Sequence, residues 1–566
     1  MADVVKIEGY NLKDKQLRED IIETKTYLGY VGDNVLGLYV DFENNIFERL
    51  GGAVGKTAGA DFNVYNMYGM RNACILDDNG VVVEEYDYYT WITGYYEDGS
   101  LGQVMVRQPK FYYKVVPIRL KKITPEDDDN YVGETTTAIS INGTTNPVII
   151  NGSSTTISKH GAVKYNNVYY EWNGSKWIAY SQTDICGYHG VEMIYYISDD
   201  PLPGFKVHPA FINSDGDVVD SYYIGVNEAS LWDASENEYR KYDTWDVTDN
   251  GHNAYTINAL NTYLADATTD KLCSIAGVKP ASGEYSTQFT RPNVNQMAKN
   301  RGDRWGAINI KILSAEQLLF IIENATFCAQ NIDSISFSTS YKTIGLCSGD
   351  SGSHNESGYT QTIMHYGRDH AGEGLLNADY EKRLKSDGSY EEILIGNSGY
   401  EGKIPVSYRF VANFYGNIIS YVDGINIWGN GKMFGGQAYI CDDFDYAESK
   451  KDGNYKPVGF VLPNKSNQYI KMFGYNEEFD WLFLPSKSGY GGNSIVPVGD
   501  YASVTSKLNG YKIVFHGGHW YANNMAGEFC WYFNNNVGGK GRSIGARLIY
   551  VPQLGPDPAP TPENNG

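Results

Sequence analysis

Residues 515–552 constrain the fold of this chain more than any other segment. Residues 515–552 read FHGGHWYANNMAGEFCWYFNNNVGGKGRSIGARLIYVP. A Gly-Gly pair and an Ala-Gly pair supply backbone freedom for sharp turns, and an aromatic run between them is typical of a strand that packs against a core. An Asn-rich loop and a closing Ile-Gly-Ala-Arg-Leu run complete the pattern. The segment therefore indicates a fixed frame around irregular residues that are suited to contacts.

This frame resembles the variable-region end of phage receptor-binding proteins with a C-type-lectin fold. That family includes the major tropism determinant and related targets of diversity-generating retroelements, and its fold is shared with formylglycine-generating enzyme. Further stretches resemble landmarks of phage and prophage tail proteins that carry this domain: QPKFYYKVV (108–116), PGFKVHPAF (203–211), DKLCSIAGVKPASG (270–283), ILSAEQLLFIIENATF (312–327), YVDGINIWG (421–429) and FDWLFLPS (479–486).

The resemblance implies a β-rich α+β protein: a C-type-lectin or formylglycine-generating-enzyme-like fold with an N-terminal attachment region and a small β insertion. We expect an attachment or oligomerisation segment at 1–28, a β-rich connecting region at 29–100 and the lectin-like domain at 101–553. A helical apolar stripe among charges at 11–26 equally fits a solvated helix that packs on its own domain.

The insertion and the tail are inferred from the residues themselves. The lectin-like domain is interrupted at 124–182, where Thr, Ser and Asn are frequent and an Asn-Gly pair at 173–174 between aromatic runs predicts a hairpin. Residues 554–566 are Pro-rich and polar, which is typical of a flexible tail.

Two helices are predicted with defined starts. Ser314 followed by Gln317 matches a capping box before a buried apolar stripe. Thr290 with Pro292 in the first turn predicts a second helix that stops near Gly302. A third helix is expected in part of residues 256–267.

Composition excludes some classes of function. The formal net charge is −22, which argues against nucleic-acid binding because phosphate contacts need clustered Lys and Arg. The sequence lacks a long uncharged apolar run, so membrane insertion is not expected, and an apolar signal peptide is missing from its start. Seven scattered Cys without CxxC spacing indicate reduced, mostly buried thiols of a protein made in a bacterial cytoplasm.

The abundant tyrosine has two interpretations. The chain contains 48 Tyr and 62 Gly, residues that binding surfaces of the antibody type use for rigid contact area and adaptable backbone. Most of these tyrosines are expected simply to fill the faces of β-sheets.

An enzymatic role is the remote alternative. Formylglycine-generating enzymes bind copper with two Cys of the C-terminal segment, whereas this window holds Cys530 alone. The nine His show no helical pairing of the metalloenzyme type. The acidic run at 442–448 offers oxygen ligands for Ca²⁺, but a solvated loop is the favoured interpretation. No cofactor, metal site or catalytic residue is therefore predicted.

The family pattern divides the C-terminal segment into frame and contact positions. The matching frame residues are Gly517, Gly518, Trp520, Ala526, Gly527, Phe529, Trp531, Asn534, Asn535, Ile544, Gly545 and Arg547. The residues predicted to contact a receptor are His519, Tyr521, Asn523, Asn524, Glu528, Tyr532, Asn536, Lys540 and Arg542. Strand alternation agrees for two of them, since Glu528 and Tyr532 face outward if Phe529, Trp531 and Phe533 face the core.

The resemblance implies a non-enzymatic virion protein, a tail fibre or adhesin. It would display this face to a protein or glycan receptor on the bacterial surface. A homotrimer attached to other tail or virion proteins through its N-terminus is expected. The alternative is a structural baseplate or head-decoration protein whose lectin-like domain docks another virion protein.

Overall fold

The structure is a computed structural model of the 566-residue chain. It describes residues 32–86, 98–127, 131–134, 148–150, 153–155, 162–172, 177–179, 186–239, 265–275, 280–282, 288–329, 363–365, 380–384, 390–394, 407–464, 468–489, 497–519, 522, 525–541 and 543–553. Strands outnumber helices among these residues, which confirms the expected β-rich α+β class.

One large sheet contains most of the chain's long strands. Its main path runs β14-β6-β13-β28-β30-β32-β31-β25-β26-β27, with β1, β2, β29 and β33 paired at its sides. The bounds are β1 (Val35–Asp41), β2 (Ile46–Gly51), β6 (Tyr112–Lys122), β13 (Tyr188–Ser198), β14 (Lys206–Val207), β25 (Ile419–Asn430), β26 (Gly436–Cys441), β27 (Tyr455–Val461), β28 (Gln468–Tyr475), β29 (Pro485–Gly489), β30 (Tyr501–Ser503), β31 (Asn509–His516), β32 (Trp531–Asn536) and β33 (Ile544–Gly545).

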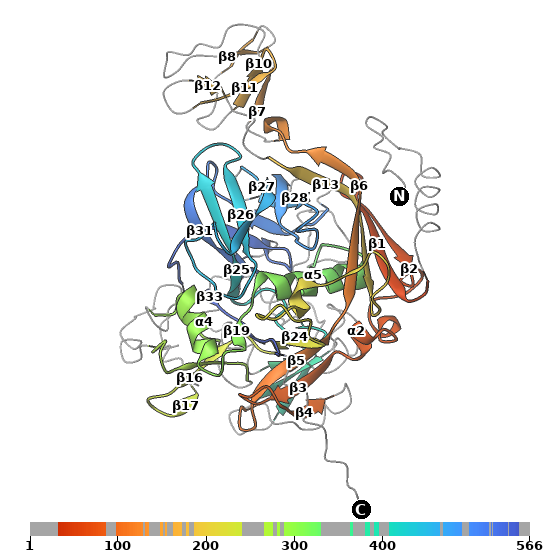
Figure 1. Cartoon of the computed structure of the whole chain (residues 1–566), viewed down its shortest axis with the longest axis vertical. Coiled ribbons are helices and arrows are strands. Elements are labelled where there is room, and N and C mark those ends of the chain that lie inside the picture. The colour runs from red at the N-terminus through yellow and green to blue at the C-terminus, as the bar shows by residue number, and fades with distance from the viewer. Residues whose placement is uncertain are drawn as a thin grey trace, which may run out of the picture.

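A second sheet of six strands lies beside the first (Figure 1), in the order β19-β34-β15-β5-β3-β4. Its strands are β3 (Asn72–Leu76), β4 (Val82–Tyr86), β5 (Gln103–Pro109), β15 (Ser221–Gly225), β19 (Trp305–Ala307) and β34 (Leu548–Tyr550). The residues expected to form a connecting region at 29–100 thus supply strands to both sheets. β1 pairs with β13 and β3 pairs with β5.

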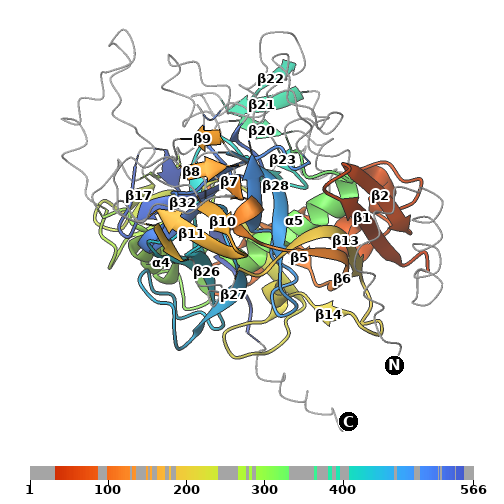
Figure 2. The same cartoon turned by 90° about the horizontal axis from the view of Figure 1, so that it is seen from above.

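Helix α5 (Ile310–Asn324) runs through the middle of the molecule, past β13 and β1 (Figures 1 and 2). Nearly all of its side chains are buried, the polar Glu316, Gln317 and Glu323 among them, so the helix is enclosed on all sides rather than exposed along one face. Its N-cap is Asn309, whose side chain accepts a hydrogen bond from the Ile312 amide. The expectation that Ser314 caps this helix is wrong, because Ser314 lies inside it and donates to the Lys311 carbonyl.

Helix α4 (Arg291–Lys299) is entered by Thr290 with Pro292 in its first turn, which confirms the second predicted helix. The other helical elements are short: α2 (Asn66–Gly69), η1 (Ala60–Phe62), η2 (Pro125–Asp127) and η3 (Pro209–Phe211). The remaining small sheets outside the insertion contain β16 (Ser230–Asp233), β17 (Glu238–Tyr239) and β18 (Lys271–Cys273), then β20 (Ile363–His365), β21 (Tyr380–Leu384) and β22 (Tyr390–Leu394), and finally β23 (Ser407–Tyr408) with β24 (Val411–Ala412).

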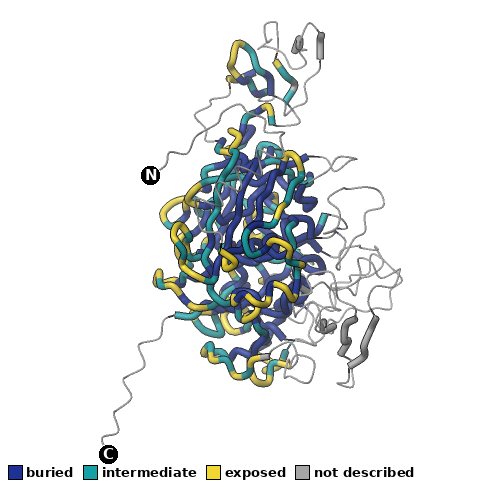
Figure 3. Tube along the Cα trace, turned by 90° about the vertical axis from the view of Figure 1, so that its right-hand side faces the viewer, coloured by how far each residue is buried: buried dark blue, intermediate teal, exposed yellow. Residues whose placement is uncertain are grey.

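A separate four-stranded sheet lies within the expected insertion and projects from one end of the body (Figures 1 and 3). It consists of β7 (Tyr131–Glu134), β10 (Ala162–Tyr165), β11 (Val168–Trp172) and β12 (Trp177–Ala179), and β8 (Val148–Ile150) pairs with β9 (Ser153–Thr155). Trp172 pairs with Trp177, so the predicted hairpin is formed. Glu171 ties this sheet to the body by accepting hydrogen bonds from Lys507 Nζ and the Met433 amide.

Several expectations lie outside the described residues. These are the attachment segment at 1–28, the tail at 554–566 and residues 256–264 of the third helix. No helix within the described part of the chain has the length and apolar character that a membrane crossing requires. The six described cysteines are buried, and none of them forms a disulfide with another described cysteine.

Candidate binding face of the C-terminal segment

The C-terminal segment folds back on itself at its Gly-Gly pair. Gly517 and Gly518 follow β31 with φ values of +98° and +82°, a region that favours glycine. A Cβ at position 518 would lie 2.6 Å from the Cβ of Ala526, so this close approach also requires glycine. The Gly517 amide donates to the Cys530 carbonyl at 3.1 Å, and the Gly527 amide donates to the Gly517 carbonyl at 3.4 Å. These two hydrogen bonds join the start of the loop, at Gly517, to its end, at Gly527 and Cys530.

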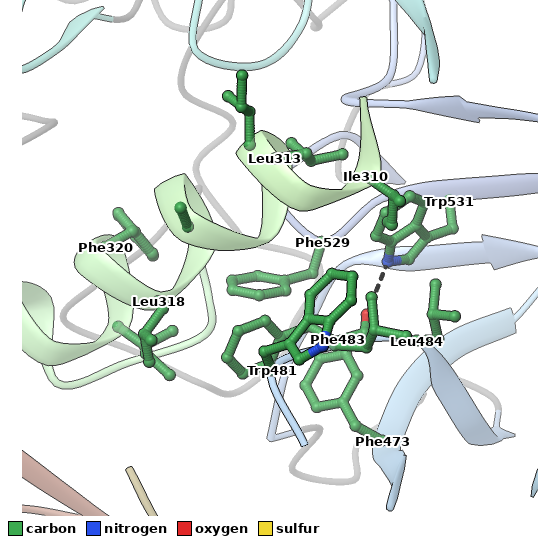
Figure 4. Close-up of a cluster of buried hydrophobic side chains, with 14 of the residues drawn as sticks. Ile310, Leu313, Leu318, Phe320, Phe473, Trp481, Phe483, Leu484, Phe529 and Trp531 are labelled. Atoms are coloured by element: carbon green, nitrogen blue, oxygen red, sulfur yellow. Dashed lines mark hydrogen bonds between the residues drawn. The ribbon is translucent and has the colours of Figure 1, made fainter. Parts of the chain in front are cut away.

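The aromatic frame of the segment packs into the main core (Figure 4). The ring of Phe529 lies 5.1 Å from that of Phe327, 5.6 Å from Phe473 and 5.7 Å from Phe483. Trp531 is fully buried, and its indole N–H donates to the Phe483 carbonyl at 3.1 Å. Burial of large aromatic side chains together with a satisfied indole N–H holds the start of β32 in one position.

Arg547 fixes the closing end of the segment. Its guanidinium donates to four main-chain carbonyls, those of Gly225, Val226, Ala412 and Asn413, at 2.8–2.9 Å. The fork of a guanidinium matches several acceptors at once, so this one side chain joins β34 to β15 and to the chain after β24. Arg547 was predicted as a frame residue from the sequence, and its place in the structure agrees with that role.

Three of the predicted contact residues lie at the surface. Tyr532 is half-buried, while Asn536 and Lys540 are exposed. Lys512 Nζ on the neighbouring strand β31 donates to Asn536 Oδ1 at 2.5 Å. The Asn-rich end of β32 therefore has the ammonium group of Lys512 beside it, in addition to Lys540 in the loop that follows. Four other predicted contacts, Tyr521, Asn523, Asn524 and Arg542, lie outside the described residues.

The expectation that Glu528 faces outward is wrong, and His519 is also buried. Glu528 is 1 % exposed and His519 is 9 % exposed. Strand alternation fails for Glu528 because β32 begins only at Trp531 and residues 528–529 form a turn. The carbonyl of Glu528 accepts a hydrogen bond from Gln317 Nε2 on helix α5 at 2.8 Å, which draws this residue inward.

Two tyrosines of the face were missed by the sequence analysis. Tyr469 on β28 pairs with Tyr501 on β30, and their rings lie 5.9 Å apart. Ser503 of β30 is the parallel partner of Tyr532, so all of these side chains point to the same side of the sheet. Asn534 extends the row and donates to Ser503 Oγ at 2.9 Å.

The row crosses three strands, and we call it the tyrosine row: Tyr469, Tyr501, Ser503, Tyr532 and Asn534. Both Tyr469 and Tyr501 are half-buried, which leaves part of each ring at the surface. Burial, with Cys530 and Tyr469 nearby, raises the pKa of Tyr501 to about 12. Its hydroxyl therefore stays neutral and remains both a donor and an acceptor at physiological pH.

A serine, a histidine and an aspartate also meet elsewhere in the structure. His189 Nδ1 lies 2.7 Å from Ser486 Oγ, and His189 Nε2 lies 3.6 Å from Asp127 Oδ2. Hydrogen-bonded Ser, His and Asp side chains in this order form the catalytic triad of nucleophilic hydrolases. Here Ser486 is only 3 % exposed and His189 is fully buried, so the contacts join β13, β29 and η2 at the base of the insertion. Their position supports a structural role.

Within the described ranges, no group of three or more His, Cys, Asp and Glu side chains is arranged to hold a metal ion. No protein family model matches the chain, and no curated protein sequence matches it.

Proposed function

We propose that this chain is a non-enzymatic receptor-binding protein of a phage virion. It presents the tyrosine row, with Asn536, Lys512 and Lys540 at its end, to a receptor on the bacterial surface. The observation that carries the proposal is the contrast between a C-terminal frame fixed by buried contacts and the half-buried Tyr469, Tyr501 and Tyr532 and exposed Asn534 that lie in one row on β28, β30 and β32. The virion location, the N-terminal attachment and the homotrimer rest on the resemblance of the sequence to phage tail proteins.

The chemistry of the face suits recognition. Tyrosine offers a large, rigid contact area with a polar tip, and it loses little conformational entropy on binding. Asparagine supplies adaptable donors and acceptors next to it. Lys512 and Lys540 add positive charge to a protein with a formal net charge of −22, so they favour an anionic partner at this edge. Three copies in a trimer would convert modest single contacts into strong attachment.

Replacing Tyr501 and Lys540 with alanine tests the proposal. The double variant should bind cells of the bacterial host at least about tenfold more weakly, because loss of a central aromatic hot spot costs about 2 kcal/mol or more and tenfold corresponds to about 1.4 kcal/mol. Labelled protein and a saturation titration on cells would measure this. A matched control on another part of the large sheet replaces Tyr439 and Lys456 with alanine, and it should bind like the unaltered protein.

Three outcomes separate the interpretations. Selective loss in the Tyr501 and Lys540 variant supports the receptor-binding role. Equal loss in both variants would indicate a general effect on the fold and contradict the assignment of this face. If none of the proteins binds cells and the unaltered chain is instead recovered on a virion protein, the structural baseplate or head-decoration role replaces this proposal.

A further inference from the structure

Strand β1 is buried on both faces of the large sheet. All seven residues of β1 and ten of the eleven residues of β13 are buried. Antiparallel sheets commonly have one face in water, and a face that is buried needs a second layer of chain against it. Helix α5 supplies this layer on one side, where Leu36, Leu38 and Val40 of β1 join the main core. The other side of β1 and β13 requires a cover as well.

The side of β2, β1, β13 and β6 that faces away from α5 has an apolar centre, and we call this side the outer face. Tyr39 on β1 pairs with Ile194 on β13, and Gly37 on β1 pairs with Tyr196 on β13 and with Leu50 on β2. A Cβ at position 37 would lie 2.6 Å from Tyr196 Cδ1, so the glycine leaves room for this ring against β1. The cluster at the centre of the outer face is only 1–8 % exposed: Val35, Tyr39, Leu50, Ile194 and Tyr196.

The loop between β13 and β14 covers one end of the outer face. The ring of Phe205 lies 6.5 Å from that of Tyr196, and Leu202 also packs against the cluster. Ile46, Val116 and Ile118 contact the cluster too, but they belong to strands of the same sheet, where side chains stand beside one another and do not cover each other's outer ends. Two partly buried side chains of one loop are too few to bury five large residues this deeply. Because the exposed fractions are those of a single chain, the further cover belongs to the same chain.

Residues 10–28, which lie outside the described ranges, have the apolar pattern of a helix that fits this face. As a helix the segment would be about 28 Å long, at about 1.5 Å per residue. This length lies between the seven residues of β1 and the eleven of β13, about 23 and 36 Å at about 3.3 Å per residue. Spacings of seven, four and seven residues place its apolar side chains along one side of an α-helix: Tyr10, Leu17, Ile21 and Leu28.

The segment is joined to the outer face by a short connection. Six residues, 29–34, separate it from Val35, which is the first residue of β1 and a member of the cluster. An extended chain reaches about 3.4 Å per residue, so Leu28 lies within about 24 Å of Val35. Covalent geometry therefore keeps the segment near this side of the sheet.

We propose that residues 10–28 form an amphipathic helix that docks on the outer face through these apolar side chains. The segment expected to attach the protein is then part of the body. Attachment to other virion proteins would use the polar side of the helix. The docking itself does not depend on the proposed receptor-binding role.

Crosslinking of the unaltered chain tests this docking. Lys114 on β6 pairs with Tyr196, so it lies at the edge of the outer face. An amine-reactive crosslinker should join Lys114 to Lys13, Lys15 or Lys25 in the species that has the mass of one chain on a denaturing gel, and mass spectrometry would identify the linked peptides. If these links occur only in species with the mass of two or three chains, the helix docks on another copy and the proposal is overturned. Absence of the links would overturn it as well.

A pair of matched variants tests which side of the helix docks. Leu17→Asp with Ile21→Asp should lower the yield of the Lys114 links at least about tenfold, because an unpaired carboxylate is strongly disfavoured on a buried apolar face. The same variant should bind an apolar fluorescent dye, since the outer face is then uncovered. The control, Leu12→Asp with Gln16→Asp, adds the same charge at the same spacing on the opposite side of the helix and should keep the links. Equal yields in the two variants would contradict docking through this side.

Discussion

Replacing Arg409 with methionine should lower the free energy of unfolding by about 3–5 kcal/mol, because it leaves a buried carboxylate without its partner. Arg409 Nη2 lies 2.6 Å from Glu323 Oε1 on helix α5, and Arg409 Nε donates to Glu323 Oε2 at 2.7 Å. The two side chains are 2 % and 0 % exposed. The guanidinium also donates to the Gly59 carbonyl, so it joins the chain before η1 to α5 and to the turn before β24.

Chemical denaturation of matched variants would measure the effect. Arg119→Met removes a surface arginine that pairs with Glu43 and Glu192 and is 34 % exposed, and it should cost less than about 1 kcal/mol. A double variant with Arg409→Met and Glu323→Leu should recover much of the lost stability, because it leaves no unpaired charge. Equal losses from Arg409→Met and Arg119→Met would contradict the importance of the buried pair.

The second large effect concerns Asp423, at the point where β25 bulges away from β31. Burial raises the pKa of Asp423 to about 7, and Arg291, with its Nε 3.6 Å from Asp423 Oδ1, offsets only part of this. In the unfolded chain an aspartate has a pKa of about 3.9. The folded state therefore binds this proton more tightly, and the aspartate costs increasing stability as the pH rises from about 4 to 7.

Asp423→Asn should remove this dependence. The unfolding free energy of the unaltered protein, minus that of the variant, should fall by about 3–4 kcal/mol between pH 4 and pH 8, since each pKa unit corresponds to about 1.4 kcal/mol. Denaturation curves at several pH values would show it. The control Asp443→Asn should give a small change of opposite sign, because the pKa of Asp443 is lowered. A difference that stays flat for Asp423→Asn would refute the assignment of this titration.

Short sequence motifs predicted the start of helix α4 correctly and the start of helix α5 incorrectly. Helix α4 starts at Arg291, directly after Thr290 and with Pro292 in its first turn, as expected, because the fixed φ of proline favours the first turn of a helix. The N-cap of helix α5 was placed five residues too late, at Ser314 instead of Asn309, since a match to the capping pattern also lies inside this helix, which is buried on all sides. The depth of that burial depends on both sheets, which a single helical segment does not encode.

The part of the candidate face that lies on a single strand was predicted from the sequence, and the part that depends on pairing between strands was not. Alternation within β32 correctly placed Trp531 and Phe533 in the core and Tyr532 toward the surface. It failed at Glu528, because the boundary between turn and strand depends on contacts with α5. Tyr469 and Tyr501 were missed because they meet the segment through pairing of β28 with β30 and of β30 with β32, over long separations in sequence.

The closure between Gly517 and Cys530 has an evolutionary consequence. Since the main-chain amide of Gly517 donates to the main-chain carbonyl of Cys530, the backbone itself holds the end of β31 beside the start of β32. Substitutions at the exposed Asn534 and Asn536, which follow the closure, can therefore change the proposed binding face while the closure stays in place, whereas Gly518 and Phe529 have no such freedom.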